Sequence, residues 1–287
     1  MAKFEMIKYR SHKYPQNIPL RIEEIAAHLD VCKIESLLDL SLHTEYSYDK
    51  RKLNSETVSA FPEIVAAQKN GVPQLWKNEV WSLQFAGFII SLVDTSQQVR
   101  IIEIHPPFDD YANLRSFVSA YKVFESKIKE HFPKAEILIE NRCGSLYRGG
   151  KFIISKIQDV FDLCNEIERI GLSLRIAYDL PQIYTAHNTS KEDAYFSILE
   201  KTKDIRKYIG GVHLWGKRLS DTGRKISHCG DLTSYFGNDS IKAAFLKAFN
   251  DCFDDDIVRK MVLEVNSGNK DLLSIIADLQ STNDDFV

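Results

Sequence analysis

The chain has 287 residues, of which 44% are hydrophobic and 27% are charged, a composition typical of a soluble globular protein. Its net charge of -3 argues against an overall basic field for nucleic acid, although a local basic patch would be enough to bind it. The five cysteines are an odd number without a C-x-x-C pair, which favours reduced thiols in a cytoplasmic protein. No apolar segment is long enough for a membrane span, so we expect a cytoplasmic protein with no membrane partner.

Short apolar segments separated by amphipathic helices predict the strands of a parallel sheet. In chain order these strands are FEMIKY (4–9), LLDLSLH (37–43), RIIEIH (100–105), AEILIE (135–140), LRIAYD (174–179), GVHLW (211–215) and MVLEV (261–265). The segment IEEIAAHLDVCK (22–33) instead predicts a helix between the first two strands. Further helices are predicted around residues 111–130, 154–171, 240–253 and 270–279.

This alternation predicts one α/β domain, residues 1–287, with the fold of a TIM-type (β/α) barrel. Seven clear βα units are one fewer than a complete barrel contains. A divergent strand between His43 and His105, an open seven-stranded barrel, or a strand supplied by a partner chain or homo-oligomer would each explain the difference. We favour an open or distorted barrel whose first strand is missing.

The predicted strands end in side chains that bind metal ions. Five lie at or near the ends of successive strands: His105, Glu140, Asp179, His213 and Glu264. In a barrel the C-terminal ends of the strands converge on one face, so these side chains are expected to form one site. Carboxylates and imidazoles together suit a divalent cation, and a cation removes the repulsion between clustered carboxylates. One such residue alone would more simply be a helix N-cap or a surface ion pair.

Other histidines extend the pattern. His43 ends the strand before that of His105, and beside Glu140 these two would hold a second cation. His187 and His228 fall in later loops and are further candidate ligands.

The motifs in this order resemble the xylose-isomerase-like TIM-barrel superfamily, which includes the endonuclease IV type of apurinic endonuclease (AP endonuclease family 2) and sugar isomerases and epimerases. The similar motifs are H-T-E-Y at 43–46, I-H-P-P at 104–107, I-E-N at 139–141, Y-D at 178–179, V-H-L at 212–214, S-H-C-G at 227–230 and L-E-V at 263–265. Each motif is short, and their order and register carry the resemblance.

The endonuclease IV branch implies three zinc ions. One would be held by His43, His105 and Glu140, and a second by Glu140 with the strand-end residues Asp179, His213 and Glu264. A third would need a histidine where this chain has Gln182, and an aspartate where it has Ile226, although His187, His228 and Asp231 lie nearby.

The isomerase branch implies a different use of the same residues. One divalent ion would be held by Glu140, Asp179, His213 and Glu264. The two glutamates would move a proton between adjacent sugar carbons.

Two enzyme classes therefore compete, and a catalytically idle barrel that serves as a binding module is a third interpretation. We favour a metal-dependent phosphodiester hydrolase that activates water with two or three ions, with Glu140 and Glu264 as its catalytic carboxylates. The ions are expected to be Zn²⁺, with Mn²⁺ or Mg²⁺ as alternatives. The substrate would contain phosphate, as in DNA, and loop cations are expected to bind it: Arg142, Arg148, Lys217 and Arg218.

Overall fold

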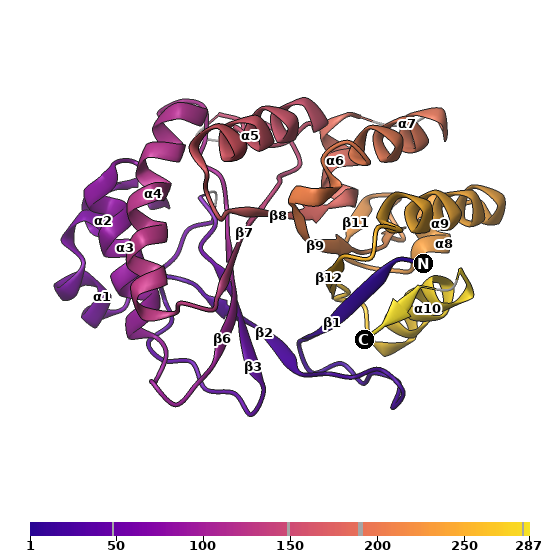
Figure 1. Ribbon diagram of the computed structural model, residues 1–287, viewed down its shortest axis with the longest axis horizontal. Coiled ribbons are helices and arrows are strands. Elements are labelled where there is room, and N and C mark those ends of the chain that lie inside the picture. The colour runs from indigo at the N-terminus through magenta and orange to yellow at the C-terminus, as the bar shows by residue number, and fades with distance from the viewer. Residues whose placement is uncertain (48, 148–149, 189–191, 283) are drawn as a thin grey trace.

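The computed structural model describes residues 1–47, 49–147, 150–188, 192–282 and 284–287. Eight parallel strands form a closed barrel, because β12 pairs with both β9 and β1. The barrel strands are β1 (Lys3–Tyr9), β2 (Ile22–Ala27), β3 (Asp39–Thr44), β6 (Val99–Ile104), β7 (Glu136–Glu140), β8 (Arg175–Asp179), β9 (Ile209–Leu214) and β12 (Val258–Leu263). The chain has the fold of a TIM barrel (Figure 1).

The expectation of a missing first strand was wrong. The segment IEEIAA, predicted to begin a helix, is β2, and it pairs with β1 through Ile7 and Ile22 and with β3 along its whole length. Its apolar residues fit a helical spacing as well as they fit a strand, and in so short a segment periodicity alone does not decide. The chain supplies all eight barrel strands itself, so no partner strand is needed to close the barrel.

Helices cover most of the outer surface of the barrel. They are α1 (Ser55–Ala60), α2 (Pro62–Ala66), α3 (Glu79–Ser91), α4 (Leu114–His131), α5 (Ile157–Ile170), α6 (Leu180–Ala186), α7 (Glu192–Thr202), the 3₁₀ turn η1 (Arg206–Tyr208), α8 (Leu232–Phe236), α9 (Asp239–Phe253) and α10 (Asn269–Ser281). Two short hairpins lie in the loops, β4 (Gln68–Lys69) with β5 (Val72–Pro73), and β10 (Lys217–Leu219) with β11 (Lys225–Ser227). None of the described helices is both long and apolar enough to cross a lipid bilayer.

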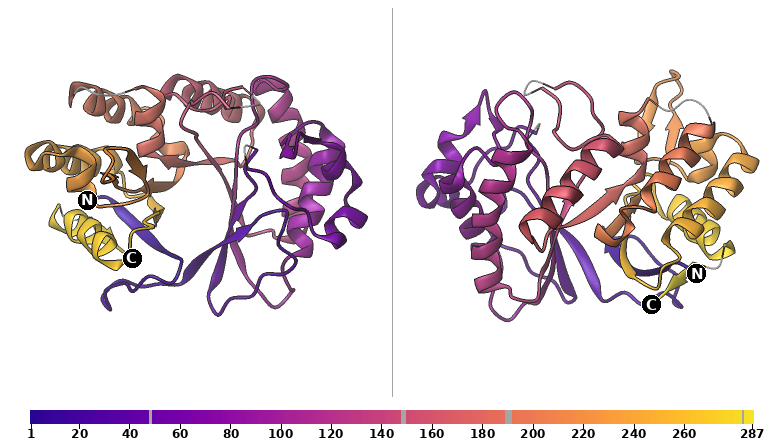
Figure 2. Two further views of the ribbon diagram at one scale, coloured as in Figure 1. Left: turned by 180° about the vertical axis from the view of Figure 1, so that it is seen from behind. Right: turned by 45° about the horizontal axis from the view of Figure 1, so that its top comes forward.

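The β1–β2–β3 side of the barrel differs from the rest. Residues 10–21 and 28–38 contain no helix, so β1 and β2 have no helix of their own outside them, as Figures 1 and 2 show. β1 pairs with β2 over only three residue pairs, and the C-terminal strand β13 (Asp285–Phe286) pairs with the beginning of β1. Tyr9 at the end of β1, together with Glu24 and Ala26 on β2, lines a polar cavity on this side of the barrel.

The interior of the barrel is layered. Near the N-terminal end of the strands, Lys260 and Glu5 form a buried ion pair. Above this pair lies an apolar layer formed by Ile7, Ile22, Ile101, Leu138, Ala177 and Val262. Because side chains two residues apart on a strand face the same way, the next inward positions place polar groups above the apolar layer. This apolar layer separates the cluster of candidate ligands from the lower end of the barrel.

Candidate metal centre

Six predicted strand-end residues lie together above the apolar layer, where they are 6% exposed or less: His43, His105, Glu140, Asp179, His213 and Glu264. β3, β7, β8 and β9 place four of them within the last two residues of the strand, and His105 and Glu264 directly follow β6 and β12. Parallel strands end on the same face of a barrel, which explains why residues so distant in sequence meet. Their roles as ligands stay a prediction.

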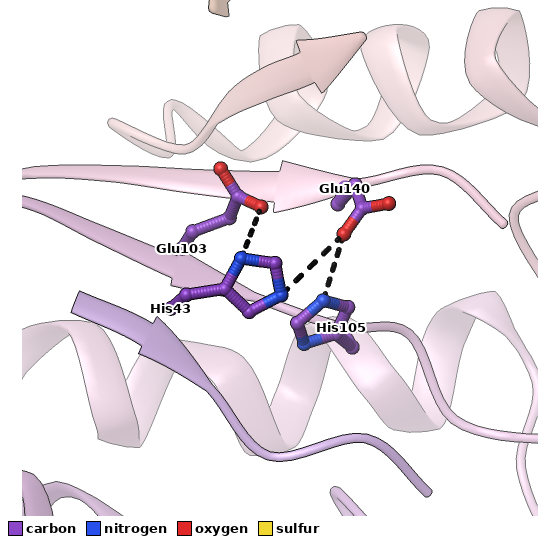
Figure 3. Close-up of side chains that lie close together, drawn as sticks. All are labelled: His43, Glu103, His105 and Glu140. Carbon is purple, nitrogen blue, oxygen red and sulfur yellow. Dashed lines mark hydrogen bonds and ion pairs between the residues drawn. The ribbon is translucent and has the colours of Figure 1, made fainter. Parts of the chain in front are cut away.

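His105 has the hydrogen-bond arrangement of a metal ligand. Its Nδ1 lies 3.1 Å from the backbone carbonyl of Glu45, which only accepts, so Nδ1 carries the hydrogen. Burial lowers the pKa of His105 to about 3, so the ring is neutral and Nε2 holds a lone pair. This Nε2 lies 2.8 Å from Oε2 of Glu140 (Figure 3). Two acceptors at this distance need a proton or a cation between them.

Glu140 is the most heavily contacted carboxylate of the site. Nη1 of Arg142 lies 2.9 Å from each of its oxygens, and Nε2 of Gln182 lies 2.5 Å from Oε1. Burial would raise the pKa of Glu140, but Arg142 and His105 outweigh it and hold that pKa well below its usual range. Glu140 is therefore an anion at every ordinary pH.

His43 lies between two groups of carboxylates. Its Nε2 is 3.9 Å from Glu140 and 2.5 Å from the hydroxyl of Tyr46, while its Nδ1 is 3.3 Å from Glu24 and 3.5 Å from Glu103. Burial opposes protonation, but the carboxylates outweigh it and raise the pKa of His43 to about 9. In the absence of a cation, the ring is therefore protonated near neutral pH.

His213 and Glu264 form the opposite wall of the site. Nε2 of His213 lies 3.0 Å from Glu103, and its Nδ1 lies 3.2 Å from Glu264. This Nδ1 is buried and has no hydrogen-bond partner among the described residues. Glu264 also lies 3.1 Å from Nδ1 of His228, whose ring stacks on Trp215 at 4.2 Å between centroids. His228 therefore lies at the edge of the cluster, and its role as a ligand stays a prediction.

Asp179 is surrounded by neutral donors. It is the N-cap of α6, where Oδ1 accepts a 2.9 Å hydrogen bond from the backbone of Gln182, and Oδ2 accepts a 2.8 Å bond from the Gln182 side chain. Nε1 of Trp215 donates to both oxygens, at 3.2 and 3.0 Å. Burial raises the pKa of Asp179 to about 7, and Glu140 and Glu264 add to the shift. The N-cap alternative considered for single strand-end acids thus applies to Asp179.

Two carboxylates of the site were missed in the sequence. Glu24 lies on β2. Because this segment was predicted to be a helix, the side chain of Glu24 was not expected to point into the barrel. Glu103 lies two residues before His105, and strand periodicity places both on the same face. That alternation was the available signal, but only the last residue of each strand was considered.

Four overlapping groups offer ligand atoms that lie within 4.8 Å of one another. The groups are His43, Glu103, His105 and Glu140; Glu24, His43 and Glu264; Glu24, Glu103 and His213; and Glu140, Asp179 and His213. Nε2 of His105 and Nδ1 of His213 fit a centre that takes divalent cations, because each nitrogen points at a carboxylate, Glu140 for the first and Glu264 for the second.

Other predicted residues lie elsewhere. The ring of His187 accepts a hydrogen bond from the backbone of Ile157 through Nε2, and His187 is in none of the four groups, so it does not contribute to the cluster. Lys217 donates to Thr185, and Arg218 is exposed on β10. Arg142 is only 7% exposed and lies inside the cluster rather than on a loop surface. Arg148 lies outside the described residues.

A polar cavity of about 280 Å³ leads into the cluster from the tops of β1 and β2. Its walls include His43 and Glu264 on the inner side and Tyr9 and Arg10 on the outer side. Arg10 has a φ of 53°, in the left-handed region that non-glycine residues rarely adopt. The cavity is thus a route by which a small polar molecule reaches the cluster.

The fold and the site together define a TIM barrel with a buried His/Glu cluster at the C-terminal ends of its strands. No protein-family model matches the chain, and no curated protein matches it. Solved structures do. A crystal structure of AsfvAP:AG is 13% identical, covers 85% of this chain and 84% of that chain, and has a TM-score of 0.47.

Two enzymes are also similar in structure. The apo form of the 3-keto-D-glucoside 4-epimerase YcjR from E. coli is 12% identical, covers 98% of this chain and 99% of that chain, and has a TM-score of 0.47. Xylanase 10B from Thermotoga maritima is 10% identical, covers 84% of this chain and 75% of that chain, and has a TM-score of 0.40. Because these identities and scores are low, the chemistry of the site rests on the residues of this chain.

Proposed function

We propose that the protein is a metal-dependent phosphodiester hydrolase, with two divalent cations at the His/Glu cluster. The contact between His105 and Glu140 carries this proposal, because a bare ring nitrogen and a carboxylate at 2.8 Å suit two neighbouring ligands of one ion. Nδ1 of His213 lies 3.2 Å from Glu264 and has no hydrogen-bond partner among the described residues, which supports a second ion position. Zn²⁺ or Mn²⁺ suits this mixture of imidazoles and carboxylates.

Bound cations would activate a water molecule and neutralise the charge that develops on the phosphoryl oxygens. The protein residues hold and orient this arrangement. Glu140 lies between the two proposed ion positions, and Arg142 keeps it ionised. Glu264 reaches the cavity and faces His228, so it is placed to orient the attacking water. Arg10 lines the cavity and would donate hydrogen bonds to a phosphate oxygen of the substrate.

A sugar or sugar-phosphate isomerase is the second candidate. The small polar cavity favours it, because a volume of about 280 Å³ suits a small molecule better than a polymer. The isomerase mechanism needs Glu140 as a base, and a base must reach the substrate with a pKa near the working pH. Glu140 is 1% exposed and its pKa is held low by Arg142 and His105, so this carboxylate suits a ligand better than a base.

A direct test compares the two activities in one preparation. The protein loaded with Zn²⁺ or Mn²⁺ is incubated with bis-p-nitrophenyl phosphate, with plain and abasic DNA oligonucleotides, and with sugars and sugar phosphates in D₂O. The proposal predicts chelator-sensitive phosphodiester cleavage without deuterium incorporation. Deuterium incorporation into a sugar without any cleavage would instead establish the isomerase.

The matched variants are Glu140→Gln in the site and Glu136→Gln at the other end of β7. Cleavage should be lost in the first variant and kept in the second. Cleavage that survives in Glu140→Gln would contradict the proposed role of this carboxylate.

A further inference from the structure

We propose that Glu24 and Glu103 are positioning residues that orient two histidines, so that His43 presents Nε2 and His213 presents Nδ1 to the cations. This inference rests on the proposed function, because it assigns the ring atoms that face the same centre. Neither carboxylate is the last residue of its strand, and from β2 and β6 both reach the histidines inside the barrel.

The contacts of His213 determine which of its ring atoms faces the cations. A neutral imidazole has one N–H and one lone pair. Nε2 lies 3.0 Å from Oε2 of Glu103, a carboxylate that only accepts, so the hydrogen lies on Nε2. Nδ1 is therefore the atom left for a cation, which would take the place of its proton: it has no hydrogen-bond partner among the described residues and lies 3.2 Å from Glu264.

His43 has a similar arrangement in which the two ring nitrogens exchange roles. Nδ1 lies 3.3 Å from Glu24 and 3.5 Å from Glu103, as Figure 3 shows for the second contact, so Nδ1 keeps its hydrogen when the ring gives up a proton to bind a cation. Nε2 is left for the side of Glu140 and His105, where the hydroxyl of Tyr46 now contacts it. A cation bound to Nε2 would displace that hydroxyl.

One carboxylate thus controls both rings. Oε1 of Glu103 faces His43 and Oε2 faces His213, and the side chain is 2% exposed. Without Glu103 and Glu24, either ring could rotate or change its tautomer and turn an N–H toward the cations. Carboxylates that accept the second N–H of a ligating histidine fix its orientation, and their loss typically weakens metal binding about 10- to 100-fold.

The test is calorimetric titration of the chelator-stripped protein with Zn²⁺. The variants are Glu103→Gln, Glu103→Ala and Glu24→Gln, with Glu23→Gln as the control, since Glu23 is the neighbouring residue on β2 and contacts Lys8 instead. Glu103→Ala should bind Zn²⁺ about 10- to 100-fold more weakly. Glu103→Gln should lose less, because its amide oxygen still accepts the N–H, and Glu24→Gln should weaken binding as well.

The number of ions per chain separates a positioning role from a ligand role. It should stay at the wild-type value in Glu24→Gln and Glu103→Gln, and the control should match wild type throughout. Loss of one ion per chain in Glu103→Gln would make Glu103 a ligand and overturn the inference. Wild-type affinity in both Glu103→Ala and Glu24→Gln would overturn it too, while leaving the proposed function intact.

Failure of the proposed function gives a different result. In that case wild-type protein itself would bind no divalent cation. Thermal melting of each variant shows whether it folds, and Glu24→Gln on a separate strand gives an independent result if the Glu103 variants do not fold.

Discussion

The two sides of the cluster satisfy their carboxylates in different ways. On the side of His43, His105 and His213, ring nitrogens face carboxylates, and Nε2 of His105 has no proton for the carboxylate that it faces. On the side of Asp179, the indole of Trp215 and the backbone and side chain of Gln182 donate to both carboxylate oxygens. We call these the imidazole side and the amide side.

Cations are needed on the imidazole side and not on the amide side. Neutral donors already satisfy Asp179, so the amide side is stable without an ion. On the imidazole side, His105 and Glu140 place an acceptor against an acceptor, an arrangement that is costly in a buried site unless a cation lies between them. The amide side therefore satisfies its carboxylate with hydrogen bonds and not with a cation.

The largest effect is expected from Glu140→Gln, because Glu140 joins the two sides. Metal affinity and phosphodiester cleavage should each fall more than about 100-fold, beyond the loss that removal of an orienting carboxylate causes. The free energy of unfolding should fall by about 1 to 3 kcal/mol, because Arg142 keeps only part of its hydrogen bonding in the buried site. Calorimetry, cleavage assays and urea denaturation measure the three effects.

His105→Ala should remove one ion per chain, because His105 Nε2 is a ligand of the imidazole side. The matched control is His187→Ala, since His187 lies outside the cluster and bonds the backbone of Ile157. The control should keep its ions and lose about 1 kcal/mol of stability. Equal ion counts in the two variants, measured by elemental analysis after gel filtration, would contradict the assignment of His105.

Metal affinity should depend on pH through the imidazole side. Carboxylates raise the pKa of His43 to about 9, so below pH 9 the ring holds a proton that must leave before the ring binds a cation. Affinity should therefore rise with pH, by up to about tenfold per unit for each proton displaced, between pH 6 and 9. Competition with a chromophoric chelator measures this slope. An affinity that is constant over this range would argue against ligation by His43.

The smallest effect is expected on the amide side. Asp179→Asn should weaken metal binding at most about tenfold, less than His213→Ala does, because the Asp179 oxygens are occupied by Gln182 and Trp215. Asparagine is also a good N-cap, so α6 should keep its start. Titration of both variants with Zn²⁺ gives the comparison. A larger loss of Zn²⁺ affinity in Asp179→Asn than in His213→Ala would contradict the placement of the cations on the imidazole side.

The sequence predicted the positions at strand ends but not the contacts between them. The barrel and its strand-end residues followed from periodicity, since parallel strands end on one face. β2 was missed because the apolar residues of IEEIAA fit a helix and a strand equally well, and Glu24 was lost with it. The ring orientations of His43 and His213, and the donors around Asp179, depend on packing between distant strands. No local sequence pattern specifies such contacts.

Anomalous diffraction from crystals grown with Zn²⁺ tests the central claim most directly. The account predicts two peaks per chain, one at about 2.0 to 2.1 Å from Nε2 of His105 and one at the same distance from Nδ1 of His213. Crystals that bind Zn²⁺ but show no anomalous peak at either of these nitrogens would contradict the claim.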